Sequence, residues 1–236
     1  MVLREQVVFE NNSTRYIAYL SRLVNLVEDI VDDAYCSSTY IGGLSLYDYS
    51  VPDRVYLEPI DCVYDPVESL EVFSSQWEID NVFIGRGSID YRELYRLVYN
   101  VYRSTLHYKM KEYSVKSSSL SREYYLAVLF NGKAFIVEGE RDRVALPVIP
   151  HCVSAHTHPT NHPYPSKHDI ESIINMMVNR GLLHAIETTS HTLYVYRVKP
   201  LCEEDIVKLR LIEGERDYRR VADLFKSIES LRIVLE

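Results

Sequence analysis

The stretch SAHTHPTNHPYPSKHD, residues 154–169, carries the strongest signal in this sequence of 236 residues. It places four histidines, three prolines and one aspartate within sixteen positions. The segment 152–158 has the composition of a strand, and 166–181 repeats apolar residues every three or four positions, as a helix does. The stretch therefore predicts a strand, a proline-stiffened loop and a helix, and it raises the question whether a metal ion binds there.

Two of the four histidines have the spacing of metal ligands. Side chains alternate between the two faces of a strand, so His156 and His158 point the same way and can share one ion. If Ser166 is the N-cap of the following helix, Asp169 is its third residue and faces back over the helix N-terminus. Two imidazoles and one carboxylate suit tetrahedral zinc with one open position, so we expect a zinc site at which catalysis is allowed.

A second interpretation of these residues needs no metal. Ser166-x-x-Asp169 also has the pattern of a capping box, with aspartate in place of glutamate, and the prolines belong in a loop. This interpretation leaves the strand spacing of His156 and His158 unexplained. Of the other histidines, two are expected to be exposed in or beside the loop, His162 and His168. Three have no ligand spacing, namely His151, His184 and His191.

Alternating and β-branched runs predict strands elsewhere in the chain. Most of them form pairs joined by a turn, and Asn131-Gly132 is the clearest hairpin signal. The expected strands are 2–10, 40–48 paired with 53–61, 123–130 paired with 134–140, 144–149, and 182–188 paired with 192–198.

Apolar residues recurring every three or four positions predict further helices. They are expected at 12–34, at 90–113, and once or twice from residue 203 onward, whereas 65–80 is ambiguous and 115–121 has the composition of a flexible connector. A stripe of tyrosines on the second helix indicates core or subunit contact, which leaves a homodimer open. The segment GRGS, residues 85–88, is the best candidate for a domain boundary.

Composition narrows the class of protein. With 47% hydrophobic and 25% charged residues, the chain has the make-up of a folded globular protein. A net charge of −8 argues against a general nucleic-acid binder, which needs clustered lysine and arginine. The apolar runs are short and the N-terminus lacks a signal-peptide pattern. We therefore expect a cytoplasmic protein that does not bind membranes.

The cysteines give no sign of a metal or redox motif. Cys36, Cys62, Cys152 and Cys202 are far apart and form no C-x-x-C pair, so free thiols are expected. Cys152 shares a strand face with His156 and is expected to be a small core residue. The low glutamine content fits a thermophile, in which even intracellular disulfides occur.

The spacing H-x-H, seven residues, S-x-x-D resembles the signature of the JAMM (MPN+/JAB) zinc metalloproteases, which cleave isopeptide bonds to ubiquitin-like proteins. All four positions match, and the prolines in HTHPTNHPYPS resemble the RadC-type bacterial branch. The resemblance covers about residues 123–198. It implies an α/β domain of the MPN/JAB (cytidine deaminase-like) type at 88–236, with a curved mixed sheet flanked by helices and with C-terminal helices. Residues 1–87 would form an N-terminal α/β extension of unknown role.

The resemblance also implies a role for each site residue. Zinc held by His156, His158 and Asp169 would activate a water, and the hydroxyl of Ser166 would donate to the developing oxyanion. A glutamate would take the proton of the water. Glu123, at the start of the predicted strand 123–130, is the expected base; two alternatives lie at the end of the next strand, Glu138 and Glu140.

The implied partner is a ubiquitin-like protein or its conjugates. Two rival functions follow from the same residues. One is a metal-binding MPN scaffold that does not catalyse, which applies if no carboxylate lies near the metal. The other is a RadC-like DNA-associated protein, which the acidic charge balance opposes.

Overall fold

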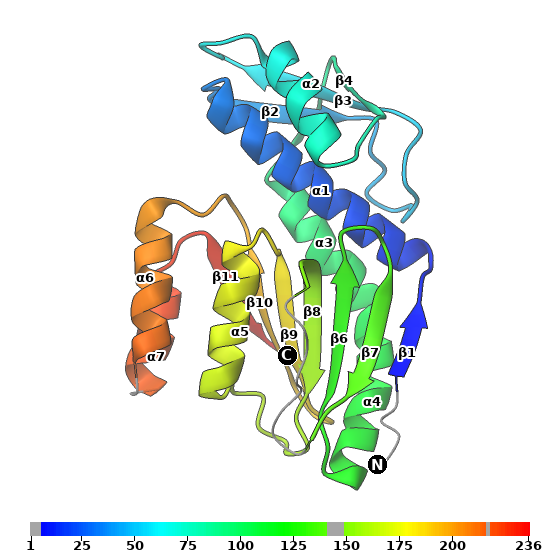
Figure 1. Cartoon of the computed structure of the whole chain (residues 1–236), viewed down its shortest axis with the longest axis vertical. Helices are drawn as coiled ribbons and strands as arrows, with labels where there is room; N and C mark the ends of the chain where they lie inside the picture. The colour runs from blue at the N-terminus through cyan, green and yellow to red at the C-terminus, as the bar shows by residue number, and fades with distance from the viewer. Residues whose placement is uncertain (1–5, 141–148, 216–217) are drawn as a thin grey trace.

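The strand that carries the histidines, β8 (His151–Thr157), lies in the middle of a seven-stranded sheet. The computed structural model describes residues 6–140, 149–215 and 218–236, and within them the chain forms two mixed sheets and seven helices (Figure 1). The order of the larger sheet is β1 (Gln6–Phe9), β7 (Ala134–Glu138), β6 (Tyr124–Leu129), β8, β9 (Leu183–Glu187), β10 (Thr192–Arg197) and β11 (Leu231–Leu235). The mixed α/β class predicted from the sequence is confirmed.

The connection from β8 to β9 positions the predicted site. These two strands run parallel, whereas the other neighbouring pairs of the larger sheet are antiparallel. A parallel pair needs a crossover, and here it is made by the proline loop and by α5 (Lys167–Val178). The crossover brings the N-terminus of α5 back beside the carboxyl end of β8.

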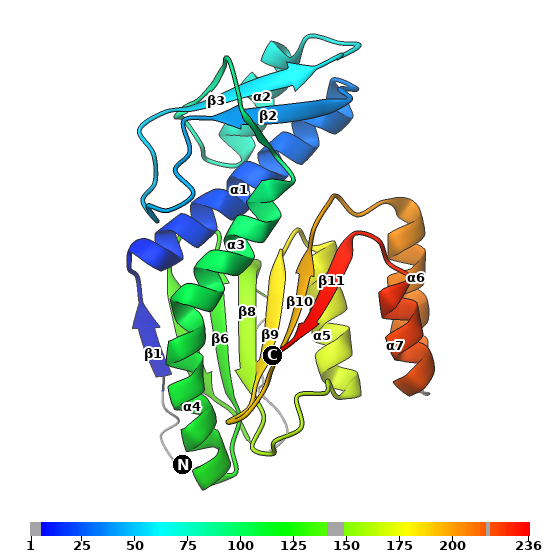
Figure 2. The ribbon, with the colours of Figure 1, turned by 180° about the vertical axis from the view of Figure 1, so that it is seen from behind.

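Helices cover both faces of the larger sheet (Figures 1 and 2). Besides α5 they are α1 (Asn12–Asp33), α3 (Glu93–Ser104), α4 (Leu106–Leu120), α6 (Glu203–Gly214) and α7 (Tyr218–Lys226). On one face α5, α6 and α7 share an apolar cluster that includes Ile173, Leu209 and Phe225. On the other face α1, α3 and α4 pack over a larger cluster that includes Leu23 and Val98. The core is therefore split into two layers by the sheet.

The second sheet is small and lies at one end of the molecule, beyond α1 (Figure 1). Its order is β4 (Val82–Ile84), β3 (Val55–Ile60), β2 (Ser38–Gly42) and β5 (Ile89–Asp90), and α2 (Pro66–Gln76) joins β3 to β4. The expected pairing of 40–48 with 53–61 is confirmed as the antiparallel pair β2 and β3. The expected extent of the first strand is wrong, because β2 ends at Gly42 and a long loop rather than a short turn leads to β3.

The predicted boundary at 87/88 falls between two strands of this one sheet, β4 and β5. Moreover, β1 pairs with β7 in the larger sheet, so the predicted N-terminal part contributes to both sheets. The division into 1–87 and 88–236 as separate units stays a prediction.

Two expectations about helices are wrong. The single helix expected at 90–113 is interrupted at Thr105, whose hydroxyl donates to the carbonyl of Val101 at 2.5 Å and competes with the helical bonds. The connector expected at 115–121 is instead the last part of α4, which ends at Ser121 with a positive φ of 53°. Within α4 the Ser114 hydroxyl donates to the backbone carbonyl of Lys111 at 2.8 Å, so a serine in this helix has a hydrogen-bond partner without leaving the helical conformation.

The sequence also missed the two short strands β4 and β5 and, near the C-terminus, β11. The five residues of β11 follow two helices, and their assignment depends on pairing with β10, which no local pattern reveals. The ambiguous segment 65–80 contains α2, whose N-cap is Asp65 and whose first residue is Pro66. Residues 2–5 and 144–148 of the predicted strands lie outside the described residues.

The expectation of four free thiols is wrong for two of them. Cys36 and Cys62 form a disulfide, and Cys152 and Cys202 are free. The physical reason lies in the small sheet: β2 and β3 pair Ser38 with Ile60, and the same register continued by two residues places Cys36 opposite Cys62. The expectation that Cys152 is a core residue is confirmed, because it is fully buried.

Among the described residues, no helix is long and apolar enough to cross a lipid bilayer. Disulfides are usual in oxidising compartments and also occur inside the cells of hyperthermophiles. The disulfide Cys36–Cys62 is therefore compatible with more than one location, and the cytoplasmic location stays a prediction.

Removing the disulfide is expected to lower the free energy of unfolding. Its cysteines are 26 positions apart, and the loss of loop-closure entropy on that scale is about 3.5 kcal/mol. The double variant Cys36→Ser/Cys62→Ser should therefore unfold at a lower urea concentration than the wild type. Reductant should shift the wild type but not the variant, and Cys202→Ser is the control. If reductant left the unfolding midpoint of the wild type unchanged, the presence of the disulfide would be contradicted.

Candidate metal centre

Three side chains converge at the carboxyl end of β8. The Nε2 atoms of His156 and His158 are 2.9 Å apart, and the carboxylate oxygens of Asp169 lie 3.3 Å from the first and 3.4 Å from the second. These side chains are 4%, 11% and 18% exposed, in the same order. The predicted ligands are therefore brought together, and their donor atoms all lie within 4.8 Å of one another.

The spacing of the donor atoms fits a small divalent metal ion. Zinc binds imidazole nitrogen at about 2.0–2.1 Å, so two ligands of a tetrahedral zinc ion are roughly 3.3 Å apart. The two Nε2 atoms are 2.9 Å apart, and each lies 3.3 or 3.4 Å from a different oxygen of Asp169, which is close to that value. Two imidazoles and one carboxylate are also a donor set that such ions accept. His156, His158 and Asp169 could thus hold a metal ion.

The capping interpretation of Ser166 and Asp169 is also correct, and it does not compete with the metal interpretation. The Ser166 N–H donates to the Asp169 carboxylate at 2.6 Å, and the Asp169 N–H donates to the Ser166 hydroxyl at 3.3 Å. The capping box holds the carboxylate at the helix start while its two oxygens face the two histidines. One local motif therefore both begins α5 and orients a carboxylate that could bind a metal ion.

Charges inside this group favour a carboxylate at Asp169. Burial alone would raise the pKa of Asp169, but the charge of His156 and the hydrogen bonds from both histidines outweigh burial and hold its pKa well below the usual range. Burial alone would lower the pKa of His158, but its contacts with Asp169 outweigh burial and raise that pKa. The charge of Glu123 acts on His158 in the same direction, so Glu123 belongs to the electrostatic surroundings of the group.

The backbone of the loop determines which nitrogen of His158 could bind a metal. Its Nδ1 lies 2.9 Å from the carbonyl oxygen of His162, and only a protonated nitrogen can form a hydrogen bond there. We therefore assign a proton to Nδ1, so Nε2, which lies toward Asp169 and His156, is the nitrogen that a metal would bind. The side chain of His162 was correctly expected to be exposed, but the role of its carbonyl was not foreseen.

His184 is a part of the centre that sequence reasoning missed. It is 1% exposed, and its Nε2 lies 2.9 Å from Nδ1 of His156. Its Nδ1 lies 2.7 Å from the hydroxyl of Ser154, which donates to the sulfur of Met176 at 3.1 Å. Burial, and then the proximity of His156, lower the pKa of His184 well below its usual value. His184 is therefore a neutral histidine buried behind a ligand.

These contacts are compatible with the tautomer of His156 that binds a metal through Nε2. When Ser154 donates to Met176, its oxygen can accept from the Nδ1–H of His184. In that arrangement Nε2 of His184 accepts from the Nδ1–H of His156, and Nε2 of His156 is the nitrogen that a metal would bind in place of a proton. A hydrogen bond to the far nitrogen of a ligating histidine orients the ring and raises its basicity. The chain thus prepares His156 to bind a metal.

Replacing His184 is expected to weaken metal binding without removing a ligand. His184→Leu fills the space but cannot accept from His156, so we expect the affinity for zinc to fall about 10- to 100-fold. His184→Gln keeps an acceptor and should recover part of the loss, whereas His191→Ala, at an exposed position, should change nothing. Competition with a chromophoric chelator measures all three variants. Equal zinc affinities of the wild type and His184→Leu would contradict a supporting role of the hydrogen bond between His156 and His184.

Glu123 lies on the same face of the sheet as the two histidines. The register of β6 and β8 pairs Tyr125 with His156, and the same register continued by two residues places Glu123 opposite His158. Opposed residues of antiparallel strands present their side chains on one face. Glu123 is 9% exposed. The structure therefore brings the expected base toward the metal group, while its catalytic role stays a prediction.

The alternative bases lie less favourably. Glu138 pairs with Tyr124, the neighbour of Tyr125, so its side chain belongs to the opposite face of the sheet. Its carboxylate forms an ion pair with Arg122. Glu140 lies beyond the end of β7, where its carbonyl accepts from the N–H of Glu123 at 2.9 Å.

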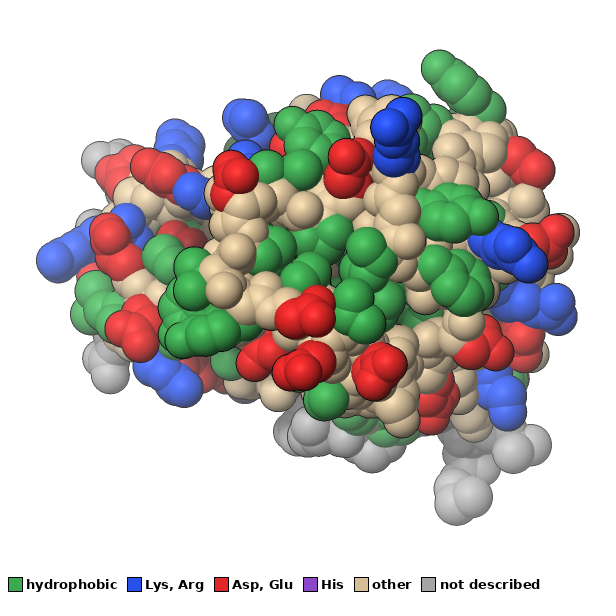
Figure 3. All heavy atoms as spheres, turned by 90° about the horizontal axis from the view of Figure 1, so that it is seen from above, with side chains coloured by type: hydrophobic (Ala, Val, Ile, Leu, Met, Phe, Trp, Pro, Cys, Tyr) green, Lys and Arg blue, Asp and Glu red, His purple; other side chains and the backbone are tan. Residues whose placement is uncertain are grey.

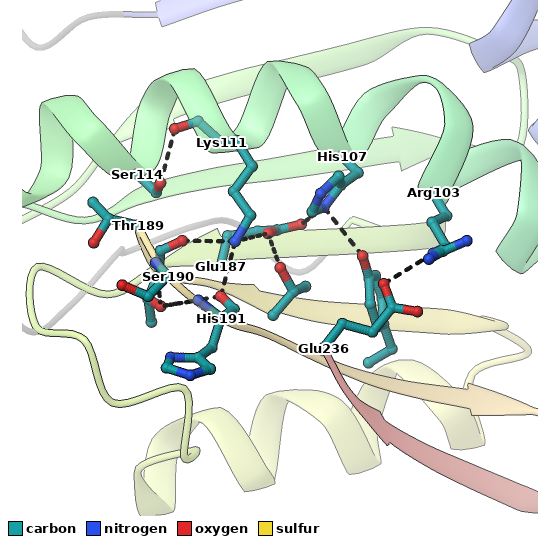
Figure 4. A network of polar contacts seen from close by, with 12 residues as sticks. Arg103, His107, Lys111, Ser114, Glu187, Thr189, Ser190, His191 and Glu236 are labelled. Carbon is teal, nitrogen blue, oxygen red and sulfur yellow. Dashed lines mark hydrogen bonds and ion pairs between the residues drawn. The ribbon is translucent and has the colours of Figure 1, made fainter.

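A buried polar network supports the centre from the other face of the sheet (Figure 4). The fully buried Glu187 accepts from Tyr102 at 3.0 Å and from Thr192 at 2.6 Å, and it lies 3.0 Å from Nδ1 of His107. The ammonium group of Lys111 donates to two carbonyls of the turn after β9. The Glu187 carbonyl accepts from the N–H of His158 at 2.9 Å. The network therefore ties α4 to the backbone beside a ligand.

Comparisons with family models, with curated proteins and with solved structures find no significant match to this chain.

Proposed function

We propose that this protein is a zinc-dependent hydrolase of isopeptide or peptide bonds, with a domain of the JAMM (MPN/JAB) type. One observation carries the proposal: the donor atoms of His156, His158 and Asp169 converge while Ser166 and Glu123 flank them. Three ligands leave a tetrahedral ion with one open position. When bound, zinc lowers the pKa of a coordinated water and polarises a carbonyl group.

Glu123 is the proton carrier in this proposal. Its carboxylate lies on the face of the two histidines and acts electrostatically on His158. A carboxylate in that position accepts a proton from the attacking water and gives it to the leaving amine. The leaving group of an isopeptide bond is a lysine amine, which needs such a proton.

Ser166 is the donor to the oxyanion. Its oxygen already accepts from the N–H of Asp169, which fixes the hydroxyl at the start of α5. A hydroxyl that accepts one hydrogen bond still has its own hydrogen to donate. A preorganised donor of this kind contributes about 3 kcal/mol to stabilisation of the transition state. The resemblance of the motif to the JAMM signature favours a ubiquitin-like protein or its conjugate as substrate.

The proposal has one serious alternative, a metal-binding scaffold without catalysis. The position of Glu123 is the feature that favours hydrolysis over the scaffold, because a scaffold needs no carboxylate beside the ligands. A role in DNA binding has no support from the charge of the chain, which is −8.

The test uses a fusion protein in which a ubiquitin-like protein precedes a reporter, and a matching isopeptide conjugate. We expect cleavage after the C-terminus of the ubiquitin-like protein, loss of cleavage with a chelator, and recovery with zinc. Cleavage that survives the chelator would contradict the role of the metal. Stoichiometric zinc without cleavage of either substrate would favour the scaffold.

A further inference from the structure

An acidic groove with aromatic walls lies in the small sheet layer, away from the metal centre. It has a volume of about 570 Å³ and runs between the end of α1 and α2. Tyr35, Tyr64 and Val72 form its apolar wall, and all three are more than 60% exposed. Its carboxylates are Asp33, Asp65 and Glu68, and no lysine or arginine lines it among the described residues.

Apart from Asp33, the residues that line the groove belong to the segment that gives the chain its negative charge. Residues 35–84 contain nine aspartates and glutamates, one arginine and no lysine, a net charge of −8, so the rest of the chain is neutral overall. The nine carboxylates form no ion pair with a cation of the described residues. Figure 3 views the molecule from this end and shows acidic side chains (red) beside hydrophobic side chains (green) at its centre.

The walls of the groove are held in place before anything binds. Tyr35 and Tyr64 form an edge-to-face pair with centroids 5.7 Å apart. Tyr35 precedes Cys36 of the disulfide, and Tyr64 follows Cys62 by two residues. The N–H groups of residues 63 and 64 also donate to the carbonyl of Ala34 at 3.0 and 3.1 Å. The aromatic pair is therefore preorganised, which lowers the entropy loss of binding.

A larger cavity nearby, of about 610 Å³, differs from the groove in its charge. It is lined by three carboxylates and two guanidinium groups: Glu28 and Asp29 pair with Arg180, Glu28 also pairs with the buried Arg197, and Asp32 forms no ion pair with a cation of the described residues. The charges of Glu28 and Asp29 are thus compensated within the chain, and one unpaired carboxylate is left in the larger cavity. The groove lacks that compensation.

We propose that the groove binds a lysine- or arginine-rich segment of another protein. A cation over the tyrosine pair gains cation–π attraction, and the carboxylates attract further cations of the segment. Apolar residues between the cations would cover Val72. A second copy of this chain does not fit, because a symmetric pair would bring two acidic faces together. The groove and the metal centre lie at opposite ends of the molecule (Figure 1), so this inference does not rest on the proposed hydrolysis.

The test measures binding of a short fluorescein-labelled peptide of lysine, glycine and leucine by fluorescence anisotropy. A peptide with glutamine in place of each lysine is the control. We expect the lysine peptide to bind at least about tenfold more tightly at low salt, and to weaken as salt screens the carboxylates. Equal binding of the two peptides, or no binding of either, would overturn the proposal.

Three variants locate the binding. Glu68→Lys should weaken binding about fivefold or more, and Tyr64→Ala about two- to fivefold through loss of a cation–π contact. Asp53→Lys makes the same charge change outside the groove and should have an effect below about twofold. Equal effects of Glu68→Lys and Asp53→Lys would overturn a specific groove. Zinc affinity should not change in any variant, so a failure here is distinguishable from a failure of the metal centre.

Discussion

Glutamine in place of Glu123 is expected to lower the rate of hydrolysis by about 10²- to 10⁴-fold. The amide cannot accept the proton of the attacking water, but it has nearly the same shape as the carboxyl group. Glu123 is also not among the three converging donors, so the variant should bind zinc as the wild type does. Cleavage of the ubiquitin-like fusion, measured with zinc content on the same samples, tests both expectations.

The matched control is Glu138→Gln. Glu138 belongs to the neighbouring strand, but the pairing of β6 and β7 places it on the opposite face of the sheet. The rate of hydrolysis by Glu138→Gln should remain within about twofold of the wild-type rate, since Glu138 has no role in proton transfer. If Glu138→Gln abolished cleavage and Glu123→Gln did not, the assignment of the base would be wrong.

Asparagine in place of Asp169 is expected to lower the affinity for zinc by more than about 100-fold. Loss of a supporting hydrogen bond to a ligand already costs 10- to 100-fold, and loss of a charged ligand should cost more. The amide oxygen can still accept from the Ser166 N–H, so the start of α5 should persist. Zinc should therefore raise the midpoint of thermal unfolding of the wild type but not of the variant.

Asp205→Asn is the matched control for that variant. Asp205 has the same place in the first turn of α6, where its carboxylate accepts from the N–H of Cys202 at 3.2 Å. It lies outside the group of possible ligands. The amide oxygen of this variant can likewise accept from the Cys202 N–H, so the start of α6 should persist and zinc affinity should be unchanged. A similar loss of affinity in both variants would mean that capping, rather than coordination, explains the result.

The parts of the centre that depend on local geometry were predictable from the sequence. Alternation along a strand places His156 and His158 on one face, and the capping pattern places Asp169 on the first turn of α5. Both rules act over a few residues, and neither depends on the rest of the fold. The same is true of the hairpin at Asn131-Gly132, where Gly132 has the positive φ of 89° that the turn requires.

What the sequence did not predict depends on strand register. His184 comes into contact with His156 because β9 runs parallel to β8 with Ser154 beside His184, and that register follows a helical crossover. The disulfide likewise depends on the pairing of β2 with β3. A buried polar residue within an apolar strand, as in LLHAIE, is the signal that would have drawn attention to His184.

Anomalous diffraction at the zinc absorption edge, from crystals grown with zinc, tests the central claim most directly. The structure predicts one strong peak about 2.0–2.2 Å from Nε2 of His156, Nε2 of His158 and a carboxylate oxygen of Asp169. The carboxylate of Glu123 should face the open position of that ion. A peak bound by other residues, or no peak at these three ligands in crystals that contain zinc, would contradict the account.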